Sequence, residues 1–122
     1  MSAEDERFTL EVPAEPAYVG TARIFASTVA RHFEVSDETV EDLKLAVSEA
    51  CSRALAGDPA DRLSIRVQRL DGRLQFEIDQ GDVAPDTVSE SPALSLELVS
   101  ALFEDAEITA SDSGAVLRFS VG

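Results

Sequence analysis

The spacing of apolar residues along the chain follows two periods, and the change between them separates the predicted elements. Several segments alternate apolar and polar residues, which is typical of strands with one buried face. These segments are residues 7–12, 63–67, 74–78, 106–110 and 117–121. Asp71-Gly72 lies between the second and third segments, and Asp112-Ser113-Gly114 lies between the last two. Because such residues favour tight turns, the pattern predicts two hairpins and one separate strand.

A period near 3.6 residues occupies much of the remaining chain and predicts helices. The predicted helices run from near 17 to 33, from 37 to about 56 and from 92 to about 103. Ser36 is the expected N-cap of the second helix, and Gly57 stands where a glycine usually follows a helix. Ser91-Pro92 is an N-cap followed by a proline in the first helical position. The polar residues 80–91 are predicted to form a loop.

The predicted element order is therefore β-α-α-β-β-α-β-β. Strands that occur in pairs favour a mostly antiparallel sheet with helices on one face, which is an α+β fold, a two-layer α/β sandwich. A length of 122 residues fits one domain. We expect residues 7–122 to form this domain and the acidic residues 1–6 to be a flexible end.

Composition and charge narrow the possible functions. Apolar residues make up 44% of the chain and charged residues 28%, as in soluble globular proteins. The chain lacks an apolar run long enough for a membrane span, and its acidic start lacks the apolar stretch of a signal peptide. We therefore expect a cytoplasmic protein.

The net charge of −14 disfavours direct binding to nucleic acid or to anionic membranes, which cationic surfaces bind. It favours a basic protein as a partner. The acidic stretch 34–49 is one candidate docking surface. The alternative is that the acidic residues form solvated faces and only keep the chain soluble.

The chain holds one cysteine, Cys51, and one histidine, His32. They are too few for a disulfide framework or for a metal site of cysteines and histidines. Cys51 has the helical spacing of a small core residue, with a redox switch as the alternative. His32 is expected to interact with the last carbonyls of the first helix.

The stretch Leu43–Ala54, with the sequence LKLAVSEACSRA, resembles the N-box helix of the anti-sigma-factor serine kinases. These kinases belong to the GHKL, or Bergerat-fold, ATPases, which contain a histidine-kinase-like ATPase domain. Weaker matches follow in the same order over residues 7–121. They are Glu11-Val12-Pro13, Ala22-Arg23, Asp71-Gly72, Ile78-Asp79-Gln80-Gly81 and Leu96-Glu97-Leu98-Val99.

The resemblance implies a Bergerat fold with an ATP and Mg²⁺ site. It places the kinase's general base at Glu49, the acceptor of the adenine amino group at Asp79 and a glycine of the nucleotide loop at Gly81. It also implies a homodimer that binds a sigma factor and an antagonist with a STAS domain. Arg23 matches a first-helix arginine that the family uses at partner surfaces.

The departures from the family pattern disfavour catalysis. Arg53 stands where the family has the asparagine that holds Mg²⁺, and a guanidinium has no acceptor to offer a cation. Glu49 and Arg53 are spaced i,i+4, which favours an ion pair between them. Val83 replaces the second glycine of the nucleotide loop, and Ala93-Leu94-Ser95-Leu96 replaces the later glycine-rich box. We therefore expect no metal ion, and we expect binding of ATP or ADP with Mg²⁺ to be disfavoured.

The charges of the expected nucleotide pocket point the same way. Between Leu74 and Leu117 there is no lysine or arginine, and a triphosphate normally meets cations or clustered backbone amides. The acidic residues in this segment are Glu77, Asp79, Asp82, Asp86, Glu90, Glu97, Glu104, Asp105, Glu107 and Asp112.

Each candidate residue also has a purely structural interpretation. Asp79 can be an acid at a strand end without a ligand, Gly81 can serve only its turn, and Arg23 can be a solvated arginine. The preferred hypothesis is a non-catalytic anti-sigma-factor-like regulator. One alternative is an active serine kinase that phosphorylates its STAS antagonist. The other is an interaction module for a different signalling protein.

Overall fold

The computed structural model describes residues 6–56, 62–80, 97–111 and 114–122. The strands are β1 (Arg7–Pro13), β2 (Arg62–Leu70), β3 (Arg73–Asp79), β4 (Glu107–Ser111) and β5 (Gly114–Val121). The helices are a short 3-10 helix (Pro16–Tyr18), α1 (Val19–His32) and α2 (Asp37–Ala56). Residues 97–102 are also helical.

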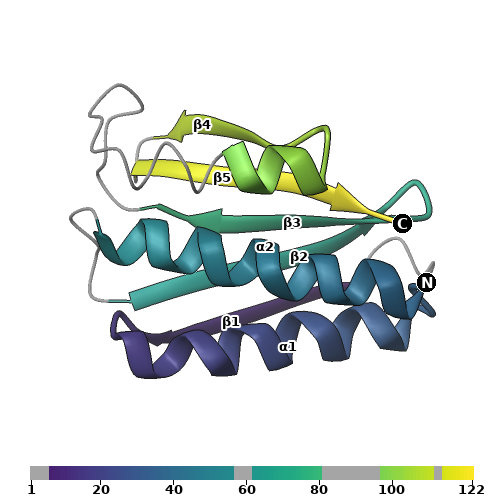
Figure 1. Ribbon diagram of the computed structural model, residues 1–122, viewed down its shortest axis with the longest axis horizontal. Coiled ribbons are helices and arrows are strands. Elements are labelled where there is room, and N and C mark those ends of the chain that lie inside the picture. Colours follow the sequence, from purple (N-terminus) through teal and green to yellow (C-terminus); the bar gives the residue numbers. More distant parts are fainter. Residues whose placement is uncertain (1–5, 57–61, 81–96, 112–113) are drawn as a thin grey trace.

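The strands form one sheet in the order β1-β2-β3-β5-β4, and every neighbouring pair is antiparallel. Both long helices and the helical residues 97–102 lie on one face of this sheet (Figure 1). The predicted α+β sandwich is therefore confirmed. We call the face of the sheet that is turned away from the helices the open face.

The core lies between the sheet and the helices. Phe119 of β5 stacks on Phe76 of β3 with ring centroids 5.5 Å apart, and on Phe103 at 4.9 Å. From α2, the small side chains of Ala46, Ala50 and Ala54 are buried in the same core. Dense packing of such apolar side chains is the main force that holds the two layers together.

The local structure explains where the elements begin and end. The Ser36 hydroxyl oxygen accepts a hydrogen bond from the Thr39 backbone N–H at 3.3 Å, so Ser36 caps α2 as predicted. The first helix differs from the prediction, because residues 16–18 form a 3-10 turn and the α-helix begins only at Val19. Asp71 and Gly72 have φ of 53° and 76° and make the tight turn predicted between β2 and β3.

Helix α1 ends in a Schellman arrangement. The Val35 N–H donates to the Ala30 carbonyl at 3.1 Å, and the Glu34 N–H donates to the Arg31 carbonyl at 3.0 Å. Glu34 takes a φ of 62°, a position that glycine usually occupies.

Several sequence predictions fall outside the described residues. They concern the end at 1–5, Gly57, the loop 81–91, Ser91-Pro92 with the start of the third helix, and Asp112-Ser113. Among the helices that are described, none is long and apolar enough to cross a membrane.

Candidate functional site

Of the residues that match the family's nucleotide site, those that the structure describes lie at one end of the molecule. The C-terminal half of α2 carries Glu49 and Arg53, and it ends on the same side as β3, which leads to Asp79 (left in Figure 1). Gly81, Val83 and the segment 93–96 lie outside the described residues. The described part of the site therefore consists of one helix and one strand end.

Arg53 lies on the buried face of α2 and is only 8% exposed. Burial lowers the pKa of its guanidinium, because the charged form loses solvation. Glu49, one turn earlier, is half-buried. The guanidinium at this position can donate hydrogen bonds and can neutralise an anion, but it cannot ligate a cation. The Glu49–Arg53 ion pair expected from the spacing stays a prediction.

Asp79 lies on the open face of the sheet. Its carboxylate accepts two hydrogen bonds from Arg66 of β2, from Nη2 at 2.7 Å and from Nη1 at 3.2 Å. This contact is the largest of the causes that raise the pKa of Arg66. Asp79 is thus engaged on the side of the sheet opposite α2. Its predicted role as acceptor of the adenine amino group stays a prediction.

Gln80 follows Asp79 directly, and its side chain lies on the opposite side of the sheet, toward α2. It is 1% exposed, and its Nε2 donates to the Ala50 carbonyl of α2 at 3.2 Å. Its backbone N–H donates to the Ala115 carbonyl at 2.8 Å, which ties the residue to β5. Sequence reasoning placed Gln80 in a loop. The signal that could have found it is the alternation of β3, since Phe76 and Ile78 share its parity and are buried.

A row of alternating charges crosses the open face. Glu77 of β3 lies between Arg66 of β2, at 3.5 Å, and Arg118 of β5, whose Nη2 is 2.8 Å from the Glu77 carboxylate. Arg118 also lies 3.9 Å from Glu107 of β4. The strand register places these four residues directly opposite one another, and we call them the charge row. The sequence did not reveal it, because a pairing across strands depends on the register.

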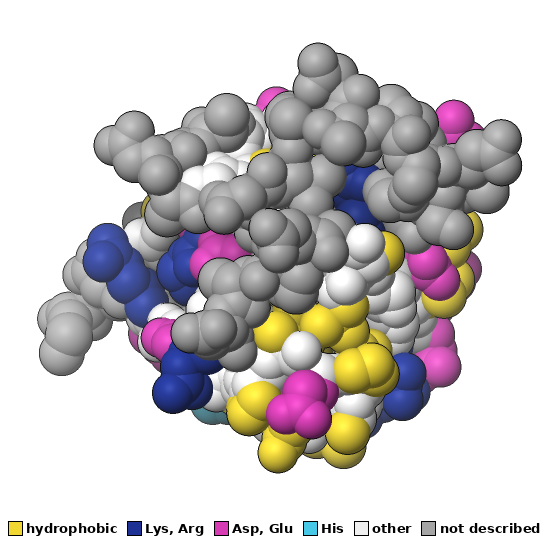
Figure 2. Space-filling view, turned by 90° about the vertical axis from the view of Figure 1, so that its left-hand side faces the viewer, with side chains coloured by type: hydrophobic (Ala, Val, Ile, Leu, Met, Phe, Trp, Pro, Cys, Tyr) yellow, Lys and Arg dark blue, Asp and Glu magenta, His cyan; other side chains and the backbone are white. Residues whose placement is uncertain are grey.

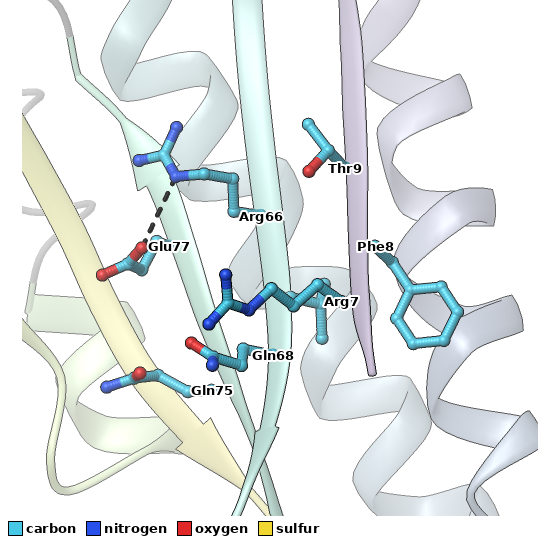
Figure 3. A pocket seen from close by; sticks show the side chains of 8 residues that line it. Arg7, Phe8, Thr9, Arg66, Gln68, Gln75 and Glu77 are labelled. Atoms are coloured by element: carbon cyan, nitrogen blue, oxygen red, sulfur yellow. Dashed lines mark hydrogen bonds and ion pairs between the residues drawn. The ribbon is translucent and has the colours of Figure 1, made fainter. Parts of the chain in front are cut away.

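A shallow pocket lies beside the charge row. In Figure 3, the side chains of Arg7, Arg66, Gln68 and Glu77 project from the same side of the sheet, and Phe8 points the other way. When the Gln68 amide is oriented with its oxygen toward Arg7, it accepts hydrogen bonds from Nε at 3.1 Å and from Nη2 at 3.2 Å. Arginines are visible at the left in Figure 2, where the open face meets the end that carries Asp79.

Arg23 links the two long helices. It is exposed on α1, and its Nη1 donates to the Ser48 hydroxyl of α2 at 3.2 Å. Its neighbour Ile24 is 68% exposed, the largest exposure among the described large hydrophobic residues. An apolar area is seen at the lower edge of Figure 2. Where β1 passes into α1, Pro13, Pro16 and Ala17 are exposed.

In the part of the chain that the structure describes, no group of three or more His, Cys, Asp or Glu side chains could hold a metal ion. Cys51 is fully buried in α2, as expected for a core residue. His32 is exposed and contacts the ring of Phe33 edge-on, with centroids 4.9 Å apart.

A single antiparallel sheet covered on one face by helices agrees with the Bergerat fold that the sequence predicts for a GHKL domain. The sequence profile of the histidine kinase-like ATPase domain matches residues 12–121. The chain belongs to this family, together with the RsbW serine-protein kinases.

The relatives carry the name serine-protein kinase RsbW. The protein from Bacillus pumilus is 33% identical over 124 residues, covering 83% of this chain and 76% of its own length. The protein from Bacillus velezensis is 38% identical over 87 residues, covering 67% of this chain and 54% of its own length. The protein from Bacillus subtilis is 40% identical over 78 residues, covering 60% of this chain and 49% of its own length. The match thus spans only about half the length of the last two relatives.

A solved structure shows the same fold. The crystal structure of the RsbU and RsbW domains of Rv1364c from Mycobacterium tuberculosis superimposes with a TM-score of 0.75 at 14% identity. It covers 95% of this chain and 32% of the longer protein.

Proposed function

We propose that the chain is a partner-switching regulator that acts by binding and not by phosphoryl transfer. It would hold a sigma factor, and a STAS-domain antagonist would release that factor by competition. The family membership supports the class of partner. The buried Arg53, at the position of the family's Mg²⁺ ligand, is the observation that carries the loss of catalysis. Occupancy then depends only on relative affinities and concentrations.

Two areas are the proposed docking surfaces. Near the start of α1, Arg23 stands beside the exposed apolar side chain of Ile24. At the other end of α1, where it gives way to α2, the acidic residues Glu34, Asp37 and Glu38 are exposed and suit a partner with basic side chains. A cytoplasmic location and a homodimer remain part of this proposal, as does a single domain over residues 7–122.

Affinity capture from the native host tests the binding function. The expected result is recovery of a sigma factor or a STAS-domain protein, identified by mass spectrometry. Arg23→Ala is expected to weaken the binding of that partner, while Arg62→Ala, at an exposed arginine that begins β2, serves as the matched control. Recovery of neither class of protein would favour the interaction-module alternative and overturn the proposal.

The loss of catalysis has a separate test. Labelled ATP with Mg²⁺ is incubated with the chain and the captured STAS protein, and transfer of the γ-phosphate is measured. We expect no transfer by the wild type. The Arg53→Asn variant is tested in parallel, because it restores the side-chain amide of the family's metal ligand. Transfer of the γ-phosphate by this variant would identify Arg53 as the cause of the lost activity.

The second candidate function is an active serine kinase, which the retention of Glu49 on α2 favours. It predicts transfer of the label by the wild type and loss of transfer in Glu49→Ala. That pair of results would replace the non-catalytic proposal with the kinase one.

A further inference from the structure

A pocket lies at the end of the molecule away from the family's nucleotide site. The turn between α1 and α2, the hairpin between β2 and β3, and the last residues of β5 line it (right in Figure 1). Its volume is about 380 Å³, which is within the range of small-molecule sites. We call it the end pocket.

The deepest residues of the end pocket are apolar. Leu74 and Val121 lie opposite each other in the register of β3 and β5, and they are 2% and 1% exposed. Val35, which follows α1, is packed against the same core. These side chains offer a ligand an apolar surface, and burial of apolar area favours binding.

Arg69 brings a positive charge to the end pocket. Its guanidinium carbon lies 4.8 Å from the centroid of the Phe33 ring, and the residue is half-buried. The ring attracts the cation and orients it, but it does not neutralise the charge. Within the described part of the chain, no carboxylate forms an ion pair with this guanidinium. The charge is therefore available to the carboxylate of a ligand.

A hydroxyl donor lies in the same pocket, at the start of α2. The Ser36 hydroxyl donates to Thr39 Oγ1 at 2.9 Å and accepts from the Thr39 backbone N–H at 3.3 Å. Because Thr39 Oγ1 is the acceptor in this pair, its own proton can be donated to a ligand. The N-terminus of α2 also carries a partial positive charge, which favours an anion here. Arg69 and Thr39 thus provide two donors for one carboxylate.

Acidic side chains accompany these donors. Glu34 lines the end pocket, is exposed and is not paired with Arg69. Asp37 and Glu38 are exposed in the first turn of α2. These acids repel a ligand that carries only a carboxylate, whereas they attract an ammonium group beside it. An α-amino acid carries both charges on one carbon.

We propose that the end pocket binds a free α-amino acid with a branched apolar side chain. Arg69 and Thr39 hold its carboxylate. Glu34 attracts its ammonium group, and its side chain lies on Leu74 and Val121. This inference goes beyond the partner-switching proposal, which involves no small molecule at this end of the molecule.

Titration of the isotope-labelled chain with leucine, followed by two-dimensional NMR, tests the proposal. The backbone amide signals of residues 33–39 and 69–74 are expected to shift, with a dissociation constant of about 1 mM or below. N-acetylleucine lacks the ammonium group and leucinamide lacks the carboxylate, so each is expected to bind about tenfold more weakly. Alanine lacks most of the apolar side chain and is also expected to bind about tenfold more weakly.

Two variants assign the two charges separately. Arg69→Gln is expected to weaken leucine binding about tenfold and to abolish the preference for leucine over leucinamide. Glu34→Gln is expected to abolish the preference for leucine over N-acetylleucine and to keep the preference over leucinamide. Arg62→Gln, at an exposed arginine that begins β2, is the matched control and leaves all of these affinities unchanged.

Three results would overturn the proposal. They are equal affinities of the wild type for leucine and any of the other three ligands, signal shifts only outside the end pocket, and no shift at about 10 mM leucine. Should Arg69→Gln fail to fold, the four affinities of the wild type still decide. The titration uses the purified chain without a partner, so this proposal and the partner-switching proposal can fail independently.

Discussion

Arg53 is the residue on which the proposal of a non-catalytic regulator depends. The residues around it on α2, Ala50 and Ala54, keep the small size that lets the helix lie against the core. The sequence alone predicted that the metal ligand is missing, because the motif around Arg53 is otherwise intact. Its burial could not be predicted, since a charged residue near a helix end is exposed in most proteins.

Cys51 allows a prediction at this same scale. Burial raises the pKa of its thiol from 9.0 to about 12. Only the thiolate reacts with disulfide reagents, so at pH 8 the native chain is expected to be labelled about a thousandfold more slowly than the urea-unfolded chain. Absorbance after addition of a chromogenic disulfide measures both rates. Labelling of the native chain at the unfolded rate would support the redox alternative.

The raised pKa of Cys51 also sets the sign of a pH effect. Between pH 9 and about 12 the unfolded thiol ionises while the native thiol stays protonated. The ionised form stabilises the unfolded state, so this thiol lowers the free energy of unfolding as the pH rises above 9. A Cys51→Ala variant is expected to lose this part of the alkaline destabilisation, measured by urea titration at pH 8 and pH 10.

At the scale of elements, the charge row links four neighbouring strands across the open face. The Glu77 side chain is 26% exposed and lies within ion-pair distance of an arginine on each neighbouring strand. Glu77→Gln leaves Arg66 and Arg118 without that charge, and we expect the free energy of unfolding to fall by about 1–2 kcal/mol. Chemical denaturation measures the change.

Glu41→Gln is the control for this prediction. Glu41 pairs with Lys44 on the surface of α2 and is 64% exposed. Such exposed pairs contribute little, so a loss below about 0.5 kcal/mol is expected. Equal losses in the two variants would show that the charge row adds nothing beyond an ordinary surface pair.

Two of the left-handed positions, Gly72 and Glu34, give an opposite pair of predictions. Gly72 has a φ of 76°, and an added Cβ would meet nothing within 4 Å, so Gly72→Ala tests the backbone alone. We expect a loss of about 1 kcal/mol. Glu34 at φ 62° is the converse case, and Glu34→Gly is expected to raise stability by up to about 1 kcal/mol. Urea titrations of both variants give the two values, and a change of the same sign in both would contradict the conformational explanation.

The elements were largely predictable because each strand and helix buries one face, which fixes a period in the sequence. The hairpin turn at Asp71-Gly72 and the Ser36 cap were predictable for a similar reason, since both depend on neighbouring residues alone. The pairing of Asp79 with Arg66 was not, because it joins two strands through the register. The burial of Gln80 was not predicted, because its polarity resembles that of the residues that follow it.

At the scale of the whole molecule, charge is distributed unevenly. The strands carry Arg7, Arg62, Arg66, Arg69, Arg73 and Arg118 against Glu11, Glu77, Asp79 and Glu107, which is a net charge of +2 from six basic and four acidic residues. The complete chain has a net charge of −14. Most acidic residues therefore lie outside the sheet.

This distribution predicts how salt affects stability. Repulsion among the many acidic residues is screened by ions, while the short contacts of the charge row are screened less. We expect the melting temperature to rise when sodium chloride is increased from about 0.02 M to 0.5 M. Differential scanning calorimetry measures the shift. A falling melting temperature would mean that attractive pairs outweigh the repulsion.

The alternation of β3 also has a consequence for how relatives of this chain are classified. The neighbouring residues Asp79 and Gln80 differ in exposure and in partner: Asp79 is partly exposed and binds Arg66, whereas Gln80 is buried against α2. A sequence alignment counts the aspartate of the family motif as retained at Asp79. In the structure, however, the side chain that faces the helices is the amide of Gln80. An insertion of one residue within β3 would turn Asp79 toward the helices and Gln80 toward the open face. Relatives of this chain are therefore better compared by which residues of β3 face the helices than by whether the aspartate is present.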